Sequence, residues 1–364
     1  MSESAIRKIK VGIWGLGRAG TTMHLSELKR FSDYFEAVAA CDLLPERGET
    51  FLKEFPGARF YTDDEAFLSD PDVELVSIVV RSQEHVEYTR RALSKGKTVF
   101  LEKPFGLSEA EADELLKLST LYPDRLFFRF NRRFEAAFNH LREIMDSGIL
   151  GDVYEIKLCR HRFQFRRDWQ TLLECGGGQL NNWGPHLIDH ALILLDSPLR
   201  DLWSDFKRVA SLGTAEDHIK ILFRGRNGRI VDLEISDGIA LPGPVYFVAG
   251  TRGTLTAQTE EEFHLRYLSP DFPLPAIGSD PGTPRIGSGY GREIPAVWLE
   301  KTIPVKPANG AFMGDIYARV YRSIREGVPF PVRLEEILAV VRTTARLRAM
   351  TGIQYVNGNG QARP

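Results

Sequence analysis

The sequence has no excess of charge of either sign. Its 47 lysines and arginines nearly balance its 49 aspartates and glutamates, for a formal net charge of −2. Nucleic acid and anionic membranes are bound through clustered positive charge, so we expect neither as a partner. A hydrophobic content of 43% and a charged content of 26% are those of an ordinary globular protein rather than a disordered chain.

Cysteine is scarce, and long apolar runs are missing. Cys41, Cys159 and Cys175 are too far apart to form a disulfide framework or a zinc motif, which favours a reducing compartment. No apolar stretch reaches the roughly 20 residues of a transmembrane helix, and the first residues do not form a secretory signal. We therefore expect a cytoplasmic protein. Its 364 residues exceed one compact core, which predicts two domains.

Strand and helix patterns alternate through the first third of the sequence. We expect strands over residues 10–14, 36–42, 58–61, 73–80, 98–103 and 125–131. The clearest helices cover 84–95 and 108–122, and Ser108 with Glu111 has the form of a capping box. Such alternation predicts an α/β fold with a parallel sheet, which binds ligands at the carboxyl ends of its strands. We assign this domain to residues 1–124.

The pattern changes after about residue 150. Residues 218–236 predict two strands joined at Asn227-Gly228, and 246–258 repeat the pattern, so the second domain, residues 125–364, should be α+β with a mostly antiparallel sheet. Residues 269–310 are rich in proline and glycine and are expected to form a long loop. Two helices, over about 312–326 and 334–351, are expected near the end of the chain.

A glycine turn follows the first expected strand. Gly15, Gly17 and Gly20 have the G-x-G-x-x-G spacing, which lets a backbone approach a pyrophosphate at a helix N-terminus. Asp42 ends the next strand, 22 residues after Gly20, where a carboxylate can accept both ribose hydroxyls of NAD. The alternative is a structural turn with a capping aspartate. Arg47 keeps NADP as the less favoured cofactor.

Two further segments carry chemical groups. Glu102 and Lys103 follow an apolar strand, where a lysine can donate to a cofactor hydroxyl and a substrate oxygen, although a surface lysine at a strand end is equally common. Residues 176–195, GGGQLNNWGPHLIDHALILL, predict a buried helix behind three glycines. Asn182 and His186 are four residues apart and therefore share a face of that helix.

The stretches GLGRAG, EKPF and GGGQLNNWGPHLID, in this order, resemble the Gfo/Idh/MocA oxidoreductases, the glucose–fructose oxidoreductase and inositol dehydrogenase family. Residues 79–104 and 130–157 resemble the family too, and the likeness is weakest over 258–312. It implies a Rossmann domain, a second domain with a large open sheet, a nicotinamide cofactor, a sugar or polyol substrate, and a homodimer or homotetramer. It also implies that Lys103 is the active-site lysine, in a Lys103-Pro104 bond often found cis, and His186 the catalytic histidine.

The resemblance and the motifs together give two sets of site residues. The residues expected at the cofactor are Gly15, Leu16, Gly17, Arg18, Ala19, Gly20, Asp42, Arg47, Val80, Arg81, Ser82, Gln83, His85, Glu102, Lys103 and Asn131. Those expected at the substrate are Arg133, Arg162, Trp169, Asn182 and His186. Arg162 and Trp169 belong to a strand-like stretch rich in cations and aromatics, which equally fits a solvated sheet face or a subunit interface. The glycines 176–178 are expected to leave room for the substrate and nicotinamide.

Asn182 departs from the family pattern, because many members carry aspartate there. An amide cannot stabilise an imidazolium as a carboxylate does, so His186 should be a weaker base here. His186 and His190 have the spacing of a helical zinc site, but no third ligand is evident and we expect no metal. Asp189 is expected to orient a neighbour or cap a buried donor, and His190 to be an interior or interface residue.

These observations favour an NAD-dependent oxidoreductase acting on a secondary alcohol or ketone of a sugar, polyol or glycoside. In this hypothesis Lys103 anchors the substrate and His186 exchanges a proton with it. One alternative is a glycosidase-like enzyme that oxidises, eliminates and re-reduces with a recycled NAD. Another is a non-enzymatic NAD-binding regulator, against which the presence of both Lys103 and His186 argues.

Overall fold

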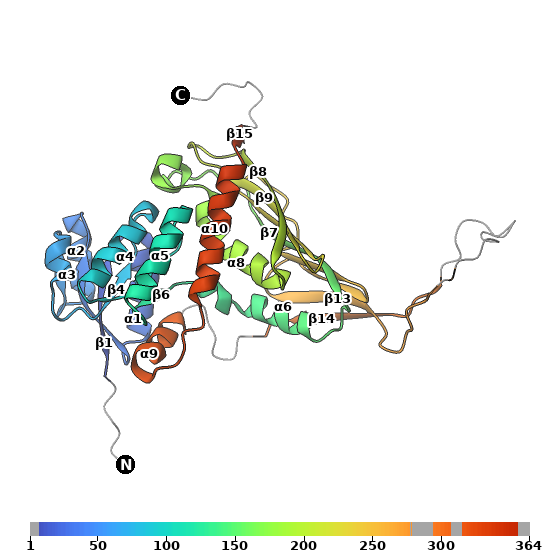
Figure 1. The fold of residues 1–364 in the computed structure, drawn as a ribbon, viewed down its shortest axis with the longest axis horizontal. Coiled ribbons are helices and arrows are strands. Elements are labelled where there is room, and N and C mark those ends of the chain that lie inside the picture. Colours follow the sequence, from blue (N-terminus) through green and yellow to red (C-terminus); the bar gives the residue numbers. More distant parts are fainter. Residues whose placement is uncertain (1–6, 277, 279–293, 307–314, 356–364) are drawn as a thin grey trace, which may run out of the picture.

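The computed structural model describes residues 7–276, 278, 294–306 and 315–355. A six-stranded sheet lies in the N-terminal part, in the order β3-β2-β1-β4-β5-β6 (Figure 1). Its strands are β1 (Ile9–Trp14), β2 (Phe35–Cys41), β3 (Arg59–Tyr61), β4 (Leu75–Ile78), β5 (Thr98–Leu101) and β6 (Leu126–Phe128). All neighbouring strands are parallel, which confirms the predicted doubly wound sheet.

Helices connect these strands in the expected alternation. They are α1 (Ser26–Arg30), preceded by a π-helical segment over Gly20–Leu25, α2 (Pro45–Glu54), α3 (Asp64–Leu68), α4 (His85–Ser94) and α5 (Glu109–Leu121). Ser108 caps α5 by accepting a hydrogen bond from the main-chain nitrogen of Glu111 (3.2 Å). The Glu111 carboxylate bonds to the main-chain nitrogen of Leu107 instead of completing a capping box. Every residue of β4 is buried, as a central strand covered on both faces requires.

The first sheet and its packing extend beyond the expected boundary at residue 124. Strand β6 pairs with β5 because its apolar residues continue the buried sheet. Helix α9 (Ile316–Glu326), from the end of the chain, also packs against this domain. The hydroxyl of its Tyr317 lies 2.8 Å from the side chains of both His24 and Ser77. The N-terminal unit is therefore built from two separate parts of the sequence.

The second sheet has nine strands, in the order β14-β13-β12-β11-β7-β10-β9-β8-β15. They are β7 (Val153–His161), β8 (Leu199–Arg208), β9 (His218–Gly225), β10 (Ile230–Ser236), β11 (Tyr246–Gly250), β12 (Gly253–Ala257), β13 (Glu262–Leu268), β14 (Trp298–Pro304) and β15 (Ile353–Tyr355). The β7–β10 and β8–β15 pairs are parallel and the others antiparallel, which confirms a mostly antiparallel sheet.

Two expectations for this domain have different outcomes. Strands β9 and β10 form the predicted hairpin, with Gly228 in the left-handed region (φ 85°). The expected loop over 269–310 is wrong for residues 298–304, which form β14 by pairing along β13. Residues 277, 279–293 and 307–314 of that loop lie outside the described residues.

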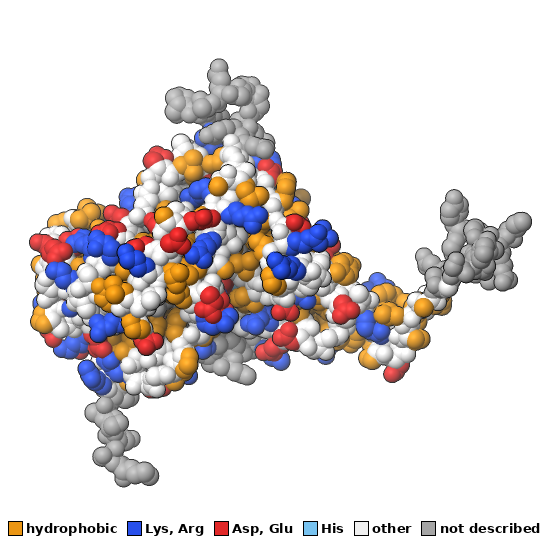
Figure 2. Space-filling model, in the orientation of Figure 1, with side chains coloured by type: hydrophobic (Ala, Val, Ile, Leu, Met, Phe, Trp, Pro, Cys, Tyr) orange, Lys and Arg blue, Asp and Glu red, His pale blue; other side chains and the backbone are white. Residues whose placement is uncertain are grey.

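The remaining helices bury one face of the second sheet and connect it to the first domain. They are α6 (Ala136–Asp146), α7 (Gln179–Asn182), α8 (Gly184–Leu195) and α10 (Leu334–Met350). Helix α8 packs on β9 and β10, and α10 lies between α8 and α5 of the first domain (Figure 1). Among the described residues, no helix is long and apolar enough to cross a membrane. Acidic and basic side chains are interspersed over the face shown in Figure 2, as the balanced composition implies.

Candidate active site

The glycine turn after β1 has the geometry of a pyrophosphate cradle. Gly15 has a φ of 105°, and a Cβ there would lie 2.6 Å from the carbonyl oxygen of Val79. A Cβ on Gly20 would lie 2.2 Å from the carbonyl oxygen of Gly15, whereas one on Gly17 would meet nothing within 4 Å. The outer glycines thus permit a tight turn, and the middle one leaves open space at the start of the helix, with Arg18 and Ala19 in its first turn.

Asp42 holds this turn from the end of β2. Its carboxylate accepts hydrogen bonds from the main-chain nitrogens of Leu16 (2.7 Å) and Leu44 (3.0 Å). The guanidinium of Arg47 lies against the same carboxylate, at 3.0 Å from Oδ2. Both residues stand where the ribose of a dinucleotide is expected, but they are paired with each other.

The segment after β4 carries further residues expected at the cofactor. His85 is buried, with Nδ1 2.7 Å from the carbonyl oxygen of Pro104 and Nε2 3.2 Å from that of Val80. Both of its ring nitrogens are therefore used by main-chain oxygens of the first domain, not by a position expected to face a ligand. Ser82 is buried beside it, while Arg81 and Gln83 are exposed and contact a loop of the second domain.

That loop lies close to the cofactor residues. The guanidinium of Arg81 lies over the ring of Trp169, 5.3 Å from its centroid. Gln83 donates to the carbonyl oxygen of Glu174 (2.7 Å), and Arg18 donates to Gln170 (3.4 Å). Trp169 therefore lies against Arg81 of the first domain, and it does not line the pocket described below.

Glu102 is placed differently from its assignment to the cofactor. Its buried carboxylate accepts from the main-chain nitrogen of Lys103 (2.5 Å) and from Arg129 (2.7 Å), so it faces the interior. Burial alone would raise the pKa of Glu102, but the charge of Arg129 and the neighbouring His24 ring outweigh it and hold that pKa below its usual range. A permanent carboxylate thus lies behind the lysine.

Lys103 connects the two domains. Its side-chain nitrogen donates to the main-chain oxygen of Asn182 over 2.9 Å, and the Lys103-Pro104 peptide bond is cis. Burial lowers the pKa of Lys103 to about 8, against the opposing effect of Glu102. The amine is therefore placed where α7 ends at Asn182, two residues before α8, which carries His186.

His186 is buried near the start of α8. Burial lowers its pKa well below 6.5, and the positive charges of Lys103 and Arg132 lower it further. Its Nδ1 atom is buried without a hydrogen-bond partner among the described residues. At neutral pH the imidazole is therefore uncharged and able to accept a proton.

Arg133 does not face the cleft as expected. Its guanidinium donates to both oxygens of Asp189 (2.7 and 2.5 Å) and also pairs with Glu336, so each of its three nitrogens has an acidic partner in the interior. The expectation that Asp189 orients a neighbour is confirmed. His190, too, is an interior residue, stacked on Phe138 with ring centroids 3.6 Å apart.

Arg132 is the arginine whose charge acts on both Lys103 and His186. Its charge lowers the pKa values of both Lys103 and His186, and its guanidinium lies 4.1 Å from the ring centroid of Trp183. It pairs with Glu135, and Asn131 is buried next to it. The sequence contains no signal that separates Arg132 from Arg133, because they are adjacent and identical.

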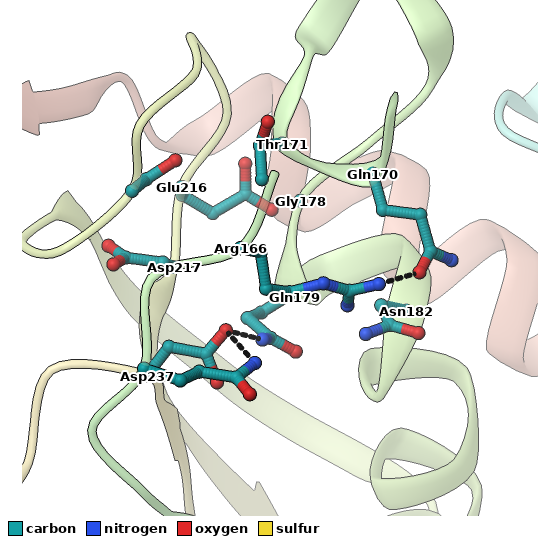
Figure 3. Close-up of a pocket in the computed structure, with 11 residues that line it drawn as sticks. Arg166, Gln170, Thr171, Gly178, Gln179, Asn182, Glu216, Asp217 and Asp237 are labelled. Atoms are coloured by element: carbon teal, nitrogen blue, oxygen red, sulfur yellow. Dashed lines mark hydrogen bonds between the residues drawn. The ribbon is translucent and has the colours of Figure 1, made fainter. Parts of the chain in front are cut away.

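A polar pocket opens beside Asn182 (Figure 3). Its lining residues are Gln164, Arg166, Gln170, Thr171, Gly178, Gln179, Asn182, Ser211, Glu216, Asp217 and Asp237. Arg162 is not among them, because its guanidinium pairs with Asp237 from outside (Nε–Oδ1 2.5 Å). Of the expected substrate residues, only Asn182 lines this pocket.

Two glycines of the run before α7 lie close to the protein's own atoms, and Gly178 also lines the pocket. A Cβ on Gly177 would lie 2.6 Å from the carbonyl oxygen of Gln170, and one on Gly178 only 2.2 Å from the carboxylate of Glu216. The glycines therefore make room for the protein's own atoms. This close approach lets Glu216 accept from the main-chain nitrogen of Leu180 (3.0 Å) at the start of the helix.

The parallel sheet with a glycine turn after its first strand is the architecture of dinucleotide-binding domains, and comparison with known proteins identifies the family. Residues 9–129 match the description "Oxidoreductase family, NAD-binding Rossmann fold", and residues 138–256 match "GFO/IDH/MocA C-terminal domain". The chain therefore belongs to the Gfo/Idh/MocA oxidoreductases, as the motifs predicted.

Individual relatives cover most of the chain. It is 25% identical over 352 residues to scyllo-inositol 2-dehydrogenase (NADP(+)) of Bacillus subtilis, covering 92% of this chain and 91% of that protein. It is 28% identical over 282 residues to trans-1,2-dihydrobenzene-1,2-diol dehydrogenase of Mus musculus, covering 73% and 81%. The crystal structure of an NAD-binding protein from Listeria innocua shares the fold, with a TM-score of 0.76, 21% identity, and 97% and 98% coverage.

Proposed function

We propose that this protein is an NAD-dependent dehydrogenase or reductase that acts on a secondary hydroxyl or ketone of a sugar, polyol or glycoside. The observation that carries the proposal is the hydrogen bond from Lys103 to Asn182. It brings an amine from the carboxyl end of a Rossmann strand to the start of the helix bearing His186. Strand ends of this kind are where open α/β sheets bind their ligands.

The residues would divide the work as follows. A bound nicotinamide supplies or accepts the hydride. The ammonium of Lys103 would hold the substrate oxygen, and neutral His186 would take the hydroxyl proton during oxidation and return it during reduction. Because Nδ1 of His186 is buried, Nε2 is the nitrogen assigned to this exchange.

The names of the relatives support a substrate with neighbouring hydroxyl groups. One is named for scyllo-inositol and another for a dihydrobenzene diol, and both carry hydroxyls on adjacent ring carbons. The shared chemistry is a ring alcohol oxidised to a ketone, which fits a site built from one amine and one imidazole.

NAD is the proposed cofactor, with NADP the weaker alternative. Asp42 carries a buried carboxylate at the end of β2, where it would repel a 2′-phosphate. Arg47 partly neutralises that carboxylate and is itself partly exposed, so it could turn toward a phosphate. The relative from Bacillus subtilis is named for NADP(+), which makes a direct comparison of the two cofactors necessary.

We also propose that the protein is a homodimer or homotetramer associated through the second sheet. Trp203 on β8 is half exposed. The cross-strand pairs that start at Trp203 continue across the sheet to Lys157 on β7 and Phe247 on β11, so these three side chains lie on the same face. Light scattering of the full-length protein, with Trp203→Glu as the disrupting variant, tests this part. A monomer in the unaltered protein would reject it.

The enzymatic proposal is tested by following reduced-cofactor absorbance with inositols, sugars, glycosides and cyclic diols, using NAD and NADP. Lys103→Met and His186→Asn should each lower kcat/KM by about 100-fold or more while NAD binding remains. His264→Asn, at an exposed position on β13, is the matched control and should retain activity.

Three outcomes decide the matter. Turnover that depends on both residues supports the proposal, and unchanged turnover in either variant rejects their assigned roles. Formation of product from a glycoside without any net change in absorbance would instead indicate a glycosidase-like cycle with recycled cofactor.

A further inference from the structure

A row of buried charged side chains lies behind Lys103. Arg129, which follows β6, is fully buried, and its guanidinium donates to Glu102 (2.7 Å) and to Glu27 (2.5 Å). Glu102 in turn accepts from the main-chain nitrogen of Lys103 (2.5 Å). The row therefore begins at the main chain of the proposed substrate-holding lysine and ends on α1, which continues the helical segment that starts at the glycine turn.

Stability alone does not favour this arrangement. Replacing a buried ion pair by apolar side chains is often neutral or stabilising, because burying the charges costs about as much as their attraction returns. Three buried atoms of this group also lack a hydrogen-bond partner among the described residues: Nε of Arg129, Oε2 of Glu27 and Nε2 of His24. Each such atom adds a further cost. Charges that are kept at this cost directly behind a reactive lysine indicate a role in its chemistry.

The charge of Glu102 depends on Arg129. Burial favours the protonated form of Glu102, and the charge of Arg129 is the strongest influence that opposes it. The His24 ring, with Nε2 3.8 Å from the Glu102 carboxylate, is uncharged at neutral pH because burial lowers its pKa to about 4. Without Arg129, the buried Glu102 should therefore take up a proton in the neutral range.

Glu102 acts on Lys103 in its turn. Its carboxylate raises the pKa of Lys103 and is, after burial, the strongest influence on it. Three cations lower the same pKa, each less strongly than Glu102 raises it: Arg18, Arg129 and Arg132. His186, the other titratable group facing the amine, is uncharged at neutral pH. Loss of the Glu102 charge should therefore lower the pKa of Lys103, even when the charge of Arg129 is lost with it.

We propose that Arg129 is a positioning residue for Lys103: it orients Glu102 against the main chain of the lysine, while Glu27 fixes the other end of its guanidinium. The inference rests on the proposed function, because it concerns the placement of the amine that holds the substrate oxygen. Arg129 is fully buried, so it acts through Glu102 and not by contact with a ligand. Through Glu27 it also connects the amine to the helix expected to bind the pyrophosphate.

The test replaces the ion pair without leaving one of its charges alone. Arg129→Met with Glu27→Leu puts apolar side chains at both positions of the full-length protein. The pKa of Lys103 is measured by NMR titration of protein labelled with ¹³C at lysine Cε, and the Lys103→Met variant identifies the signal. This pKa should fall by about one pH unit. The alkaline limb of kcat/KM should move to lower pH with it, because the ammonium is then lost earlier as the pH rises.

The matched control is Arg325→Met with Glu74→Leu. It removes the same kinds of side chain from a partly buried ion pair (2.5 Å) that joins α9 to the start of β4. The pKa of Lys103 and the alkaline limb should stay where they are. A loss of packing or stability alone would affect both variants, so only a specific link from Arg129 to Lys103 separates them.

A second pair of variants shows whether the effect passes through Glu102. Glu102→Gln keeps an oxygen that can accept from the main-chain nitrogen of Lys103 but removes the charge, so it should lower the pKa of Lys103 by itself. Adding Arg129→Met and Glu27→Leu to Glu102→Gln should then lower the pKa no further. A further fall would show that Arg129 acts by another route and would overturn the proposal.

Arg129→Lys separates charge from orientation. A lysine keeps the positive charge but lacks the planar fork that holds two carboxylates. The pKa of Lys103 should stay near 8, while kcat should fall about tenfold because Glu102 is no longer oriented. This variant decides the matter if Arg129→Met with Glu27→Leu does not fold, which circular dichroism reports. An unaltered kcat would overturn the positioning role.

Failure of this inference and failure of the proposed function give different results. An unchanged pKa of Lys103 in Arg129→Met with Glu27→Leu overturns the inference even if the protein oxidises a polyol. If that pKa falls as expected but no compound in the screen supports hydride transfer, the link from Arg129 to Lys103 stands and the proposed function is overturned.

Discussion

The side-chain nitrogen of Lys103 lies 2.9 Å from the main-chain oxygen of Asn182, so a strand end of the first domain is bonded to the junction of α7 and α8 in the second. The two groups proposed for proton and substrate handling thus come from different domains. Their relative position is set by the domain interface, where α10 contacts both α5 and α8. Any change that shifts this interface should alter kcat before it alters cofactor binding.

The pKa of Lys103 predicts an alkaline limit to activity. Burial lowers this pKa to about 8, so the ammonium that holds the substrate oxygen is lost as the pH rises through that value. The lowered pKa of His186 leaves the neutral base present down to below pH 6.5. We expect kcat/KM to be level between these limits and to fall above about pH 8. Lys103→Arg should shift the alkaline limb of the kcat/KM profile to higher pH. An alkaline limb at the same pH would show that another group titrates there.

Asn182→Asp should make His186 a stronger base. A carboxylate near the imidazole stabilises its charged form, so the apparent pKa of the acid limb should rise by about one unit. The matched control is Asn181→Asp, because the side-chain oxygen of Asn181 accepts from Arg348 (2.6 Å), away from the histidine. The pH dependence of kcat/KM measures both. An acid limb that stays in place or moves to lower pH contradicts the prediction.

Arg47→Ala should sharpen the preference for NAD. Without the guanidinium, the carboxylate of Asp42 is no longer neutralised and repels a 2′-phosphate more strongly. We expect the ratio of kcat/KM for NAD over NADP to increase about tenfold, the effect of one nearby charge. Lys53→Ala, at an exposed position on the same helix, should leave the ratio unchanged. A fall in the ratio would mean that Arg47 serves NAD instead.

Arg133→Met should affect stability more than chemistry. It leaves the carboxylate of Asp189 buried without its partner, which typically lowers the free energy of unfolding by about 3–5 kcal/mol. Denaturant unfolding measures the loss, and adding Asp189→Asn should restore part of it. The exposed Arg346→Met is the control, with an expected change within about 0.5 kcal/mol. If the Arg133→Met protein is as stable as the unaltered protein and has a raised KM, the prediction is wrong and Arg133 contacts the substrate.

The sequence signals that succeeded were local ones. The spacing of Gly15, Gly17 and Gly20 constrains the backbone within a single turn, and the structure has that turn with open space at Gly17. Asn227-Gly228 specifies its hairpin in the same way, since Gly228 supplies the positive φ. The cis Lys103-Pro104 bond, implied by the resemblance of the EKPF stretch, is likewise present.

The signals that failed depended on distant partners. Which of two adjacent arginines is buried is decided by Asp189, 56 residues from Arg133, and by Glu336, 203 residues away. Strand β14 forms only because β13 offers an edge to pair with. The sequence shows that positions 177 and 178 have no side chains. It does not show that atoms of Gln170 and Glu216 occupy the space that side chains there would need.

The packing of α9 on the first domain bears on how the chain folds during synthesis. Tyr317 fills a buried position and lies within hydrogen-bond distance of His24 and Ser77, although nearly three hundred residues separate it from His24. The ribosome must therefore release almost the whole polypeptide before the nucleotide-binding unit can acquire its last helix. Until then the nascent protein carries an unfilled polar niche, and chaperones should associate with it longer than with a Rossmann domain assembled from consecutive residues.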